Sequence, residues 1–494
     1  MESCIGRLKR GASVYFIGIK GTGVCALAEL ASSMGLKVKG SDTTEQFYTD
    51  EILQGLGIPY HETFEPAHIS GDIDLVIHSA AYSGENNAEL AEARRKSIPI
   101  VSYAEALGAH SAAFDSTGVA GVHGKTTTTA MCGCLIKGLG LPAQALVGSA
   151  VANFNGRSTI ALGNKYFVAE TCEYRKHFLS FHPKRIILTA VESDHQDFFP
   201  TYESIRGAFV EYCRLIPPGG ELIYCADDPG ASEVAGIIEN ENRGISLIPY
   251  GFNADGYYRV RSYHVEDDRA VFTIAGFPEE LRLRVPGRHQ ALNAAAALAF
   301  ASVLIQKESG GWNEPLRIAA AKALEEFSGS KRRSEIIGSA GGVIFMDDYG
   351  HHPTAIQTTL EGLRSFYPSR RLIVSFMSHT YTRTAALLDD FAGSLAAADV
   401  LVLHKIYASA REHFDGKVSG ESIYEKINSW PDKKADTIIY IDEPMDAVKP
   451  LKEILKPGDL FLTLGAGSNW PLGLELYRHY HAGHCQAVDG AAHD

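Results

Sequence analysis

A segment of small and basic residues at positions 121–129 has the composition of a phosphate-binding loop. It lies between an apolar stretch at 117–120, expected to be a strand, and a helical pattern at 125–139. Glycines let backbone N–H groups approach phosphate oxygens, Lys125 can reach the β- and γ-phosphates, and the Thr126 hydroxyl can bind Mg²⁺. Val119 stands where the strict pattern has glycine. The segment still predicts a Mg-ATP site formed by Gly121, Val122, His123, Gly124, Lys125, Thr126 and Thr127.

A second glycine-rich turn follows the apolar stretch at 14–17 and opens a helical pattern. Gly21, Gly23 and Ala26 match the G-x-G-x-x-G/A spacing, and Asp42 lies 19 residues beyond Gly23 at the end of the next expected strand. This context is typical of a pyrophosphate site at a helix N-terminus. From these residues alone, a nicotinamide dinucleotide, another nucleotide diphosphate and a purely structural turn remain open.

Two side chains with metal-binding chemistry follow expected strands of the middle segment. Glu170 comes after 166–169, and His195 comes after 185–189. The carboxyl ends of parallel strands share one edge of a sheet, and the loop of Lys125 lies on that edge. A carboxylate and an imidazole there suit a second Mg²⁺, but a hydrogen-bonded surface pair fits the spacing equally well. Nearby competitors for the same role are Glu173, Asp194 and Asp197.

Polar groups also collect after expected strands in the last third of the chain. Residues 347–353 contain two acids and two histidines, Asp348 and His351 among them. His379 and Arg383 follow a later strand, at 371–376. Arg333 lies in a basic run, which is more often a solvated surface. His289 and Asn293 are four residues apart at an expected helix start, so they can share a helix face.

These groups require an α/β scaffold with parallel sheets. The 494 residues suggest about three domains, each opening on a βα pattern. We expect a Rossmann-like domain at 1–112, a central P-loop domain at 113–328 and a doubly wound, Rossmann-like domain at 329–494. Residues 245–285 look antiparallel, because apolar alternation there has no intervening helix.

Composition narrows the classes of function. The net charge of −13 argues against nucleic acid or an anionic membrane as a partner. No apolar run approaches the roughly 20 residues of a membrane span, and the first residues lack a signal-peptide pattern. Eight scattered cysteines indicate reduced thiols in a cytoplasmic protein.

Taken in order, these motifs make the chain similar to the Mur ligases, the ATP-dependent enzymes that build the stem peptide of peptidoglycan. The resemblance covers roughly residues 12–470. Its marks are Gly18–Gly23, 123–129, Glu170 with Glu173, Asp194-His195, Pro286-Gly287 with His289 and Asn293, Arg332-Arg333, and Asp347-Asp348-Tyr349-Gly350-His351-His352-Pro353. The last string is the most specific to the branch of the family that adds L-alanine.

The resemblance implies a role for each segment. The first domain would bind the UDP of a sugar nucleotide through Gly18, Gly21, Thr22, Gly23, Ser41, Asp42 and Ser79. ATP would contact the phosphate-binding loop, His289, Asn293 and Arg333. Thr126, Glu170 and His195 would serve Mg²⁺, and the catalytic set would be Lys125, Glu170, His195, Arg333 and Asp348. His351, His379 and Arg383 would face the amino acid.

The implied reaction joins L-alanine to the carboxylate of UDP-N-acetylmuramate through an acyl phosphate, in a monomer or homodimer. His351, His352 and His379 remain open as the base that deprotonates the amine. The alternatives are a recycling ligase with a tripeptide acceptor, an NAD-dependent dehydrogenase that carries a P-loop, and a plain P-loop ATPase.

The sequence departs from the family pattern at three places. Gln290 replaces an asparagine, and 171–175 lacks the usual acidic run. Thr380 stands where the family has the first of two arginines near the amino-acid carboxylate, whereas Arg383 is retained. Val210 occupies the place of the lysine that other branches carbamylate, in keeping with the alanine-adding branch.

Overall fold

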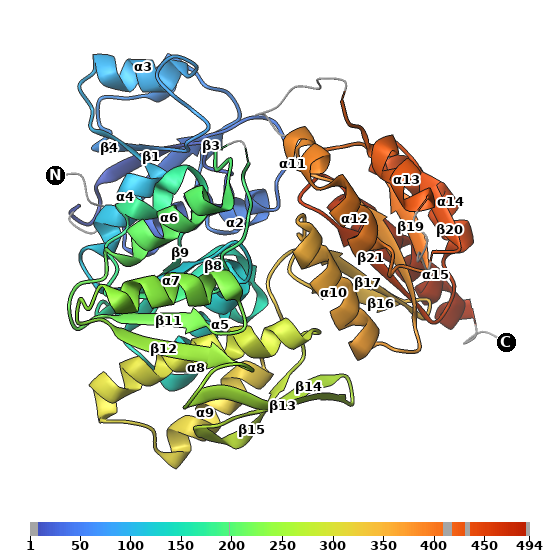
Figure 1. The fold of residues 1–494 in the computed structure, drawn as a ribbon. Coiled ribbons are helices and arrows are strands. Elements are labelled where there is room, and N and C mark those ends of the chain that lie inside the picture. Colours follow the sequence, from blue (N-terminus) through green and yellow to red (C-terminus); the bar gives the residue numbers. More distant parts are fainter. Residues whose placement is uncertain (1–7, 197, 409–416, 430–434, 491–494) are drawn as a thin grey trace.

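The computed structural model describes residues 8–196, 198–408, 417–429 and 435–490. Three β-sheets follow one another along the chain, each covered by helices (Figure 1). The predicted α/β class is therefore confirmed. None of the helices in the described part of the chain combines the length and hydropathy that a bilayer span requires.

The first sheet has five parallel strands in the order β3-β2-β1-β4-β5. They are β1 Ser13–Ile17, β2 Lys37–Ser41, β3 Tyr60–His61, β4 Leu75–His78 and β5 Ile100–Ser102. Its helices are α1 Thr22–Ser33, α2 Thr49–Gly55, α3 Ala88–Arg95 and α4 Tyr103–Ser111. Every residue of β1 is buried, as expected of a parallel strand with both faces covered.

The central sheet has ten strands in the order β15-β14-β13-β12-β11-β10-β6-β9-β7-β8. They are β6 Asp115–Ala120, β7 Ala143–Val151, β8 Arg157–Ala161, β9 Tyr166–Glu170, β10 Arg185–Leu188, β11 Glu221–Cys225, β12 Ser246–Gly251, β13 Tyr258–Glu266, β14 Arg269–Ile274 and β15 Phe277–Leu283. The strands from β12 to β7 are parallel, whereas β13, β14 and β15 pair antiparallel. The antiparallel pattern predicted for 245–285 is therefore confirmed for these last three strands and wrong for β12, which pairs parallel with β11 and β13.

Five helices cover this sheet: α5 Lys125–Leu139, α6 Tyr202–Cys213, α7 Pro229–Asn240, α8 Arg288–Ser309 and α9 Glu314–Glu325. The phosphate-binding loop leads directly into α5, and α8 packs against α5. Small side chains permit that close approach, because Ala294 to Ala297 are all fully buried. The helix start predicted around His289 thus lies beside the phosphate-binding loop.

The third sheet has the order β16-β17-β21-β18-β19-β20. Its strands are β16 Glu335–Ala340, β17 Val343–Asp348, β18 Arg371–Phe376, β19 Val400–Leu403, β20 Thr437–Tyr440 and β21 Asp459–Leu464. Its helices are α10 Pro353–Phe366, α11 Tyr381–Ala386, α12 Leu388–Leu395, α13 Gly420–Asn428, α14 Val448–Ile454 and α15 Trp470–Gly490. The sheet is parallel except for β16, an edge strand that the sequence pattern did not predict.

Buried polar contacts join the three sheets. Glu29 of α1 accepts hydrogen bonds from the Ser158 backbone N–H and the Thr159 hydroxyl of β8, at 3.0 and 2.7 Å. At the other junction, the Ser149 hydroxyl of β7 donates to the Lys331 carbonyl at 2.8 Å. These contacts leave the carboxyl edge of the central sheet between the first and third sheets (Figure 1).

Candidate active site

The phosphate-binding loop lies between β6 and α5 in a conformation that requires glycine. Gly121 and Gly124 have φ of +139° and +80°. A Cβ on Gly121 would lie 2.2 Å from the Thr189 hydroxyl oxygen. Gly124 is the N-cap of α5, and no side chain caps that helix end. The first backbone N–H groups of α5 are therefore available to an anion, which is the arrangement expected for a phosphate.

Lys125 begins α5, and its ammonium group faces a carboxylate. Its Nζ lies 3.0 and 3.2 Å from the two Glu173 carboxylate oxygens and also donates to the Gly121 carbonyl. Burial is the largest single influence on the Lys125 pKa and lowers it, but the nearby acidic groups, Glu173 first among them and Glu170 as well, together raise the pKa above its usual value. Lys125 is thus held as a cation at the entrance to the loop, where a phosphate group can replace Glu173.

Glu173 also contacts His195, one of the predicted metal ligands. The His195 Nε2 lies 3.4 Å from a Glu173 oxygen, and His195 has a left-handed φ of +53°. Burial is the largest single influence on the Glu173 pKa and raises it, but the charge of Lys125 and the contact with His195 together lower the pKa below its usual value. Lys125, Glu173 and His195 therefore form one cluster of contacting polar side chains at the carboxyl edge of the sheet.

Glu170 ends β9 beside the same group. Its Oε2 accepts a hydrogen bond from the Gly148 backbone N–H at 3.0 Å. A Cβ on Gly148 would lie 2.3 Å from that oxygen, so only glycine permits this approach. Thr126, the second residue of α5, is 4% exposed. The predicted metal ligands thus lie on adjoining elements around the loop.

Asn293 and its neighbours on α8 form a hydrogen-bond network with the first turn of α5, which follows the loop. The Thr128 hydroxyl donates to the Asn293 Oδ1 at 3.2 Å, and the Asn293 amide donates to the Gln290 Oε1 at 3.2 Å. The Gln290 amide lies 3.0 Å from the His289 Nε2. Burial lowers the His289 pKa to about 4, so the ring is neutral. Gln290, one of the departures from the family pattern, therefore takes part in an intact network.

The first glycine turn lies at the carboxyl end of β1. A Cβ on Gly18 would lie 2.8 Å from the Ser79 Cβ, and one on Gly23 would lie 2.8 Å from the Tyr103 ring. Asp42 accepts hydrogen bonds from the Lys20 and Thr43 backbone N–H groups at 2.7 and 2.8 Å. Its carboxylate therefore braces the turn.

The side chains of Ser41 and Lys20 are also engaged within the first sheet. Ser41 is fully buried and donates to Glu89 at 2.5 Å. The Lys20 ammonium lies 2.8 Å from Glu62 and 3.2 Å from Asp50. Gly21 and Thr22, two of the residues predicted to bind the UDP group, lie at the start of α1, where backbone N–H groups can face a pyrophosphate. A contact from Ser41 to a ligand would have to come from its backbone.

Asp348 and Arg333 lie where the third sheet joins the central one. Asp348 accepts hydrogen bonds from the Ser334 and Gly350 backbone N–H groups at 2.6 and 2.7 Å, so it organises the turn after β17. The Arg333 guanidinium lies over the Tyr349 ring, 4.9 Å from its centre. Arg333 is therefore placed by stacking, which leaves its N–H donors able to contact an anion.

Arg383 makes a buried contact across the interface between the second and third sheets. Its Nη2 and Nε lie 2.7 and 3.1 Å from the Asp194 Oδ1, and both side chains are about 5% exposed. Arg383 also lies 3.3 Å from the His379 Nδ1, and the His351 ring is 5.9 Å from the His379 ring. Burial and the charge of Arg383 lower the His351 pKa. The three residues predicted to face the amino acid therefore lie together.

The comparisons with known proteins agree with this arrangement. Family models match three successive stretches: "Mur ligase family, catalytic domain" at 13–115, "Mur ligase middle domain" at 119–301 and "Mur ligase, glutamate ligase domain" at 332–467. The chain is 49% identical over 470 residues to the UDP-N-acetylmuramate–L-alanine ligase of Treponema pallidum, covering 95% of this chain and 97% of that one.

The chain belongs to the Mur ligase family. It is therefore an ATP-dependent ligase that forms amide bonds. A second relative, the UDP-N-acetylmuramate–L-alanine ligase of Borreliella burgdorferi, is 38% identical over 93% of this chain and 97% of its own length. A solved UDP-N-acetylmuramate–alanine ligase from Thermotoga maritima superposes with a TM-score of 0.76 at 24% identity, covering 95% of this chain and 99% of that chain. At that identity the superposition shows the shared fold.

Glu173 and Asp194 have roles in the site of this Mur ligase that the sequence did not predict. From the sequence, Glu173 and Asp194 are competitors of Glu170 and His195 for the metal and belong to the motifs of the family resemblance, with no cation assigned to either. Each instead holds a cation: Glu173 pairs with Lys125, and Asp194 pairs with Arg383. Their position after parallel strands was the available signal, but spacing could not show which cation each would face. Asp197, the third competitor, lies outside the described residues.

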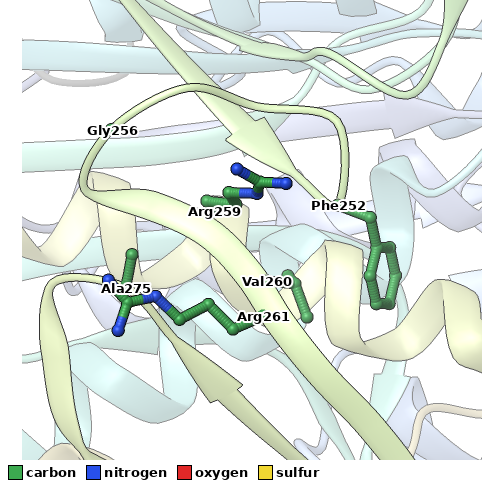
Figure 2. A pocket seen from close by; sticks show the side chains of 6 residues that line it. All are labelled: Phe252, Gly256, Arg259, Val260, Arg261 and Ala275. Atoms are coloured by element: carbon green, nitrogen blue, oxygen red, sulfur yellow. The ribbon is translucent and has the colours of Figure 1, made fainter.

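A separate hollow lies on the antiparallel end of the central sheet of the Mur ligase. Figure 2 shows its lining: Phe252, Gly256, Arg259, Val260, Arg261 and Ala275. Arg259 and Arg261 alternate with buried Val260 along β13, so both guanidinium groups lie on the exposed side of the strand. No predicted site residue lines this hollow, and it has no part in the proposed chemistry.

Proposed function

We propose that this enzyme joins L-alanine to the carboxylate of UDP-N-acetylmuramate, with hydrolysis of ATP to ADP and phosphate, in peptidoglycan synthesis. The observation that carries the proposal is the convergence of a phosphate-binding lysine and a carboxylate-binding arginine at one interface, through Lys125–Glu173 and Arg383–Asp194. The 49% identity to a relative of that name supports the same assignment.

The donor half of the reaction uses the loop before α5. The muramoyl carboxylate attacks the γ-phosphorus of ATP, the bond to the β–γ bridging oxygen breaks, and ADP leaves. Lys125 neutralises charge on the transferred group, and the N-terminus of α5 binds its oxygens. Asn293 fixes the helix that carries both, through Thr128. The product is an acyl phosphate, from which water must be excluded.

Mg²⁺ fits the groups around this loop. Thr126, Glu170 and His195 are the residues that would hold it, and the Glu170 oxygen 3.0 Å from the Gly148 N–H is already directed by the backbone. Oxygen donors beside a triphosphate are the usual environment of Mg²⁺. When bound, the ion neutralises phosphate charge.

The acceptor half uses the third sheet. A guanidinium can bind a carboxylate through two parallel hydrogen bonds. In this structure the Arg383 Nη2 and Nε both donate to one Asp194 oxygen, Oδ1, at 2.7 and 3.1 Å. L-Alanine would bind Arg383 through its carboxylate in competition with Asp194. Its amine, deprotonated by His351 or His379, then attacks the acyl carbon, and phosphate leaves from the tetrahedral intermediate.

The chain's environment and domain limits complete the proposal. We place the UDP-sugar domain at 1–112, the ATP domain at 113–328 and the amino-acid domain at 329–494, supported by the family stretches at 13–115, 119–301 and 332–467. The enzyme would act in the cytoplasm, where ATP and nucleotide sugars are made, as a monomer or homodimer. Cell shape and division would depend on its product.

The test measures ADP release by purified enzyme with ATP, Mg²⁺ and each acceptor in turn. Turnover should require both UDP-N-acetylmuramate and L-alanine, and the product should be the alanyl sugar nucleotide by mass spectrometry. A preference for L-alanyl-γ-D-glutamyl-meso-diaminopimelate would instead assign the recycling ligase. ADP release indifferent to both acceptors would leave only an ATPase.

A dehydrogenase is not favoured by the structure. In a nicotinamide site, the acidic residue after the second strand binds a ribose hydroxyl. Here Asp42 is buried and both of its oxygens accept backbone hydrogen bonds. We therefore expect no saturable NAD binding, and a change in nicotinamide absorbance during turnover would contradict the ligase assignment.

A further inference from the structure

Three side chains from separate elements meet beside the phosphate-binding loop, outside the groups assigned to Mg²⁺. His123 belongs to the loop itself, and Glu192 follows β10. His352 is the N-cap residue of α10, a helix that packs on the third sheet. One ligand atom from each lies within 4.8 Å of the other two. Two imidazoles and a carboxylate at such distances are a set of donors that proteins use for late transition metals.

The environment of His352 is unusual for a structural histidine. The residue is 6% exposed, and neither ring nitrogen has a hydrogen-bond partner among the described residues. Burying an unpaired polar group costs free energy, and most such groups in folded proteins are satisfied. The ring centre lies 5.2 Å from that of His123. The free nitrogens of His352 thus lie beside two other donors.

Glu192 is oriented by contacts to both sides of the interface. Its carboxylate pairs with the His123 Nε2, and its Oε2 accepts a hydrogen bond from the Thr354 hydroxyl at 3.1 Å. A second contact of this kind commonly fixes a ligating carboxylate in proteins. Metal–ligand bonds of about 2.0–2.2 Å place tetrahedral donors roughly 3.5 Å apart. To bind an ion, the directly paired His123 and Glu192 atoms would separate, and the His352 nitrogen would complete a set whose atoms already lie within 4.8 Å of one another.

We propose that His123, Glu192 and His352 form a binding site for a late first-row divalent cation, Zn²⁺ in particular, that is separate from the Mg²⁺ of the reaction. Two imidazole nitrogens with one carboxylate suit Zn²⁺, whereas the proposed Mg²⁺ set has a single imidazole, that of His195, beside oxygen donors. The fourth position is open to water. A bound ion would tie the phosphate-binding loop to α10 and so hold the second and third sheets together.

The site predicts inhibition as well as binding. Lys125 lies two residues after His123, so an ion at this site restrains the loop that must accept ATP and release ADP. Domain opening for product release would be slowed in the same way. Zn²⁺ should therefore reduce turnover in the presence of excess Mg²⁺, and loss of either Glu192 or His352 should relieve the inhibition.

The experiment titrates the full-length, metal-free protein with ZnSO₄ against a chromophoric chelator. Glu192→Gln and His352→Asn should each weaken Zn²⁺ binding at least tenfold. His264→Asn is the matched control, because His264 on β13 is 56% exposed and remote from the cluster. Circular dichroism checks that each variant is folded. Because the two variants lie on different elements, one of them still tests the site if the other does not fold.

Co²⁺ gives an independent readout. The wild-type protein should show the visible d–d bands of a tetrahedral nitrogen and oxygen site, and these should disappear in Glu192→Gln and His352→Asn. Equal Zn²⁺ isotherms and equal Co²⁺ spectra in wild type and both variants would overturn the proposal. Ligase turnover with Mg²⁺ alone is a separate measurement, so either proposal can fail without the other.

Discussion

The ATP-binding (donor) half and the amino-acid-binding (acceptor) half of the site each contain a cation paired with a carboxylate, but the two pairs are formed differently. In both, a cation that would bind a substrate anion is paired with a protein carboxylate. Lys125 and Glu173 belong to the central sheet alone, with N–O distances of 3.0 and 3.2 Å. Arg383 and Asp194 come from two sheets and lie 2.7 Å apart. One pair is therefore formed by the fold of one domain, and the other only by the docking of two.

This difference separates the two chemical steps. The phosphate-binding loop is held by β6, α5 and α8 of the central sheet, and Arg333 is the one proposed ATP contact that the third sheet supplies. The amino-acid site exists only when α11 faces the loop after β10. Thr380, the N-cap residue of α11, has a φ of +68°, which is strained for a β-branched residue. His195 in the donor half also has a left-handed φ, of +53°, but it is not β-branched, so the more strained of the two residues lies in the half of the site that must be assembled.

The largest effect should come from removing the donor cation. Lys125→Met should reduce kcat by at least about 10²-fold, because a positioned charge on the transferred phosphate is lost. The reduction should be the same at every L-alanine concentration. The measurement is steady-state ADP release, with Lys137→Met on the far end of α5 as the control. Partial rescue by high L-alanine would contradict the separation of the two halves.

The acceptor cation should act on one substrate only. Arg383→Lys replaces a planar, two-point contact by a point charge. The KM for L-alanine should rise by about 10- to 100-fold, and the KM for ATP should stay within experimental error. Initial rates over a grid of both substrates give the two constants. An equal rise in both would mean that Arg383 positions the loop rather than the amino acid.

The approach of Glu170 to Gly148 should be sensitive to a single methyl group. Gly148→Ala places a Cβ 2.3 Å from the Glu170 Oε2, so the carboxylate must move. The Mg²⁺ concentration for half-maximal activity should rise about tenfold. Gly207→Ala is the control, because a Cβ there meets nothing within 4 Å. An unchanged Mg²⁺ requirement in Gly148→Ala would remove Glu170 from the metal site.

The smallest effect should be that of Glu173→Gln on the free energy of unfolding and on its dependence on pH. Lys125 lowers the Glu173 pKa, so this carboxylate stabilises the fold above its unfolded pKa of about 4.3 and the stabilisation is lost as pH falls. Glu173→Gln should lower the free energy of unfolding at pH 7 by an amount on the order of 1 kcal/mol. The difference from wild type should shrink toward pH 4 in denaturant titrations. A difference that grows in acid would refute the assignment.

Much of the scaffold could be predicted because it rests on local patterns. Apolar runs that end in glycine or polar residues located β1, β6, β10 and β18, and the glycine turns located the starts of α1 and α5. The edge strand β16 was missed because its sequence, Glu335–Ala340, lacks a continuous apolar run. Its place in the sheet comes from antiparallel pairing with β17.

Which side chains would pair across the site could not be predicted in the same way. Asp194 and Arg383 are 189 residues apart, and their contact depends on how two sheets dock. The proximity of His123 and His352 also depends on how the two sheets dock, because the two residues belong to separate motifs in the sequence. Spacing within one element indicates a shared face, but it carries no information about the partner on another sheet.

The most direct test of the two-halves account is the burst of ADP formed by rapid mixing of enzyme with ATP, Mg²⁺ and UDP-N-acetylmuramate without L-alanine. The account predicts a burst of the same size and rate in wild type and Arg383→Lys, with only the later, alanine-dependent step slowed in the variant. A burst that is lost in Arg383→Lys would show that the donor site also needs the docked third sheet, and would contradict the account.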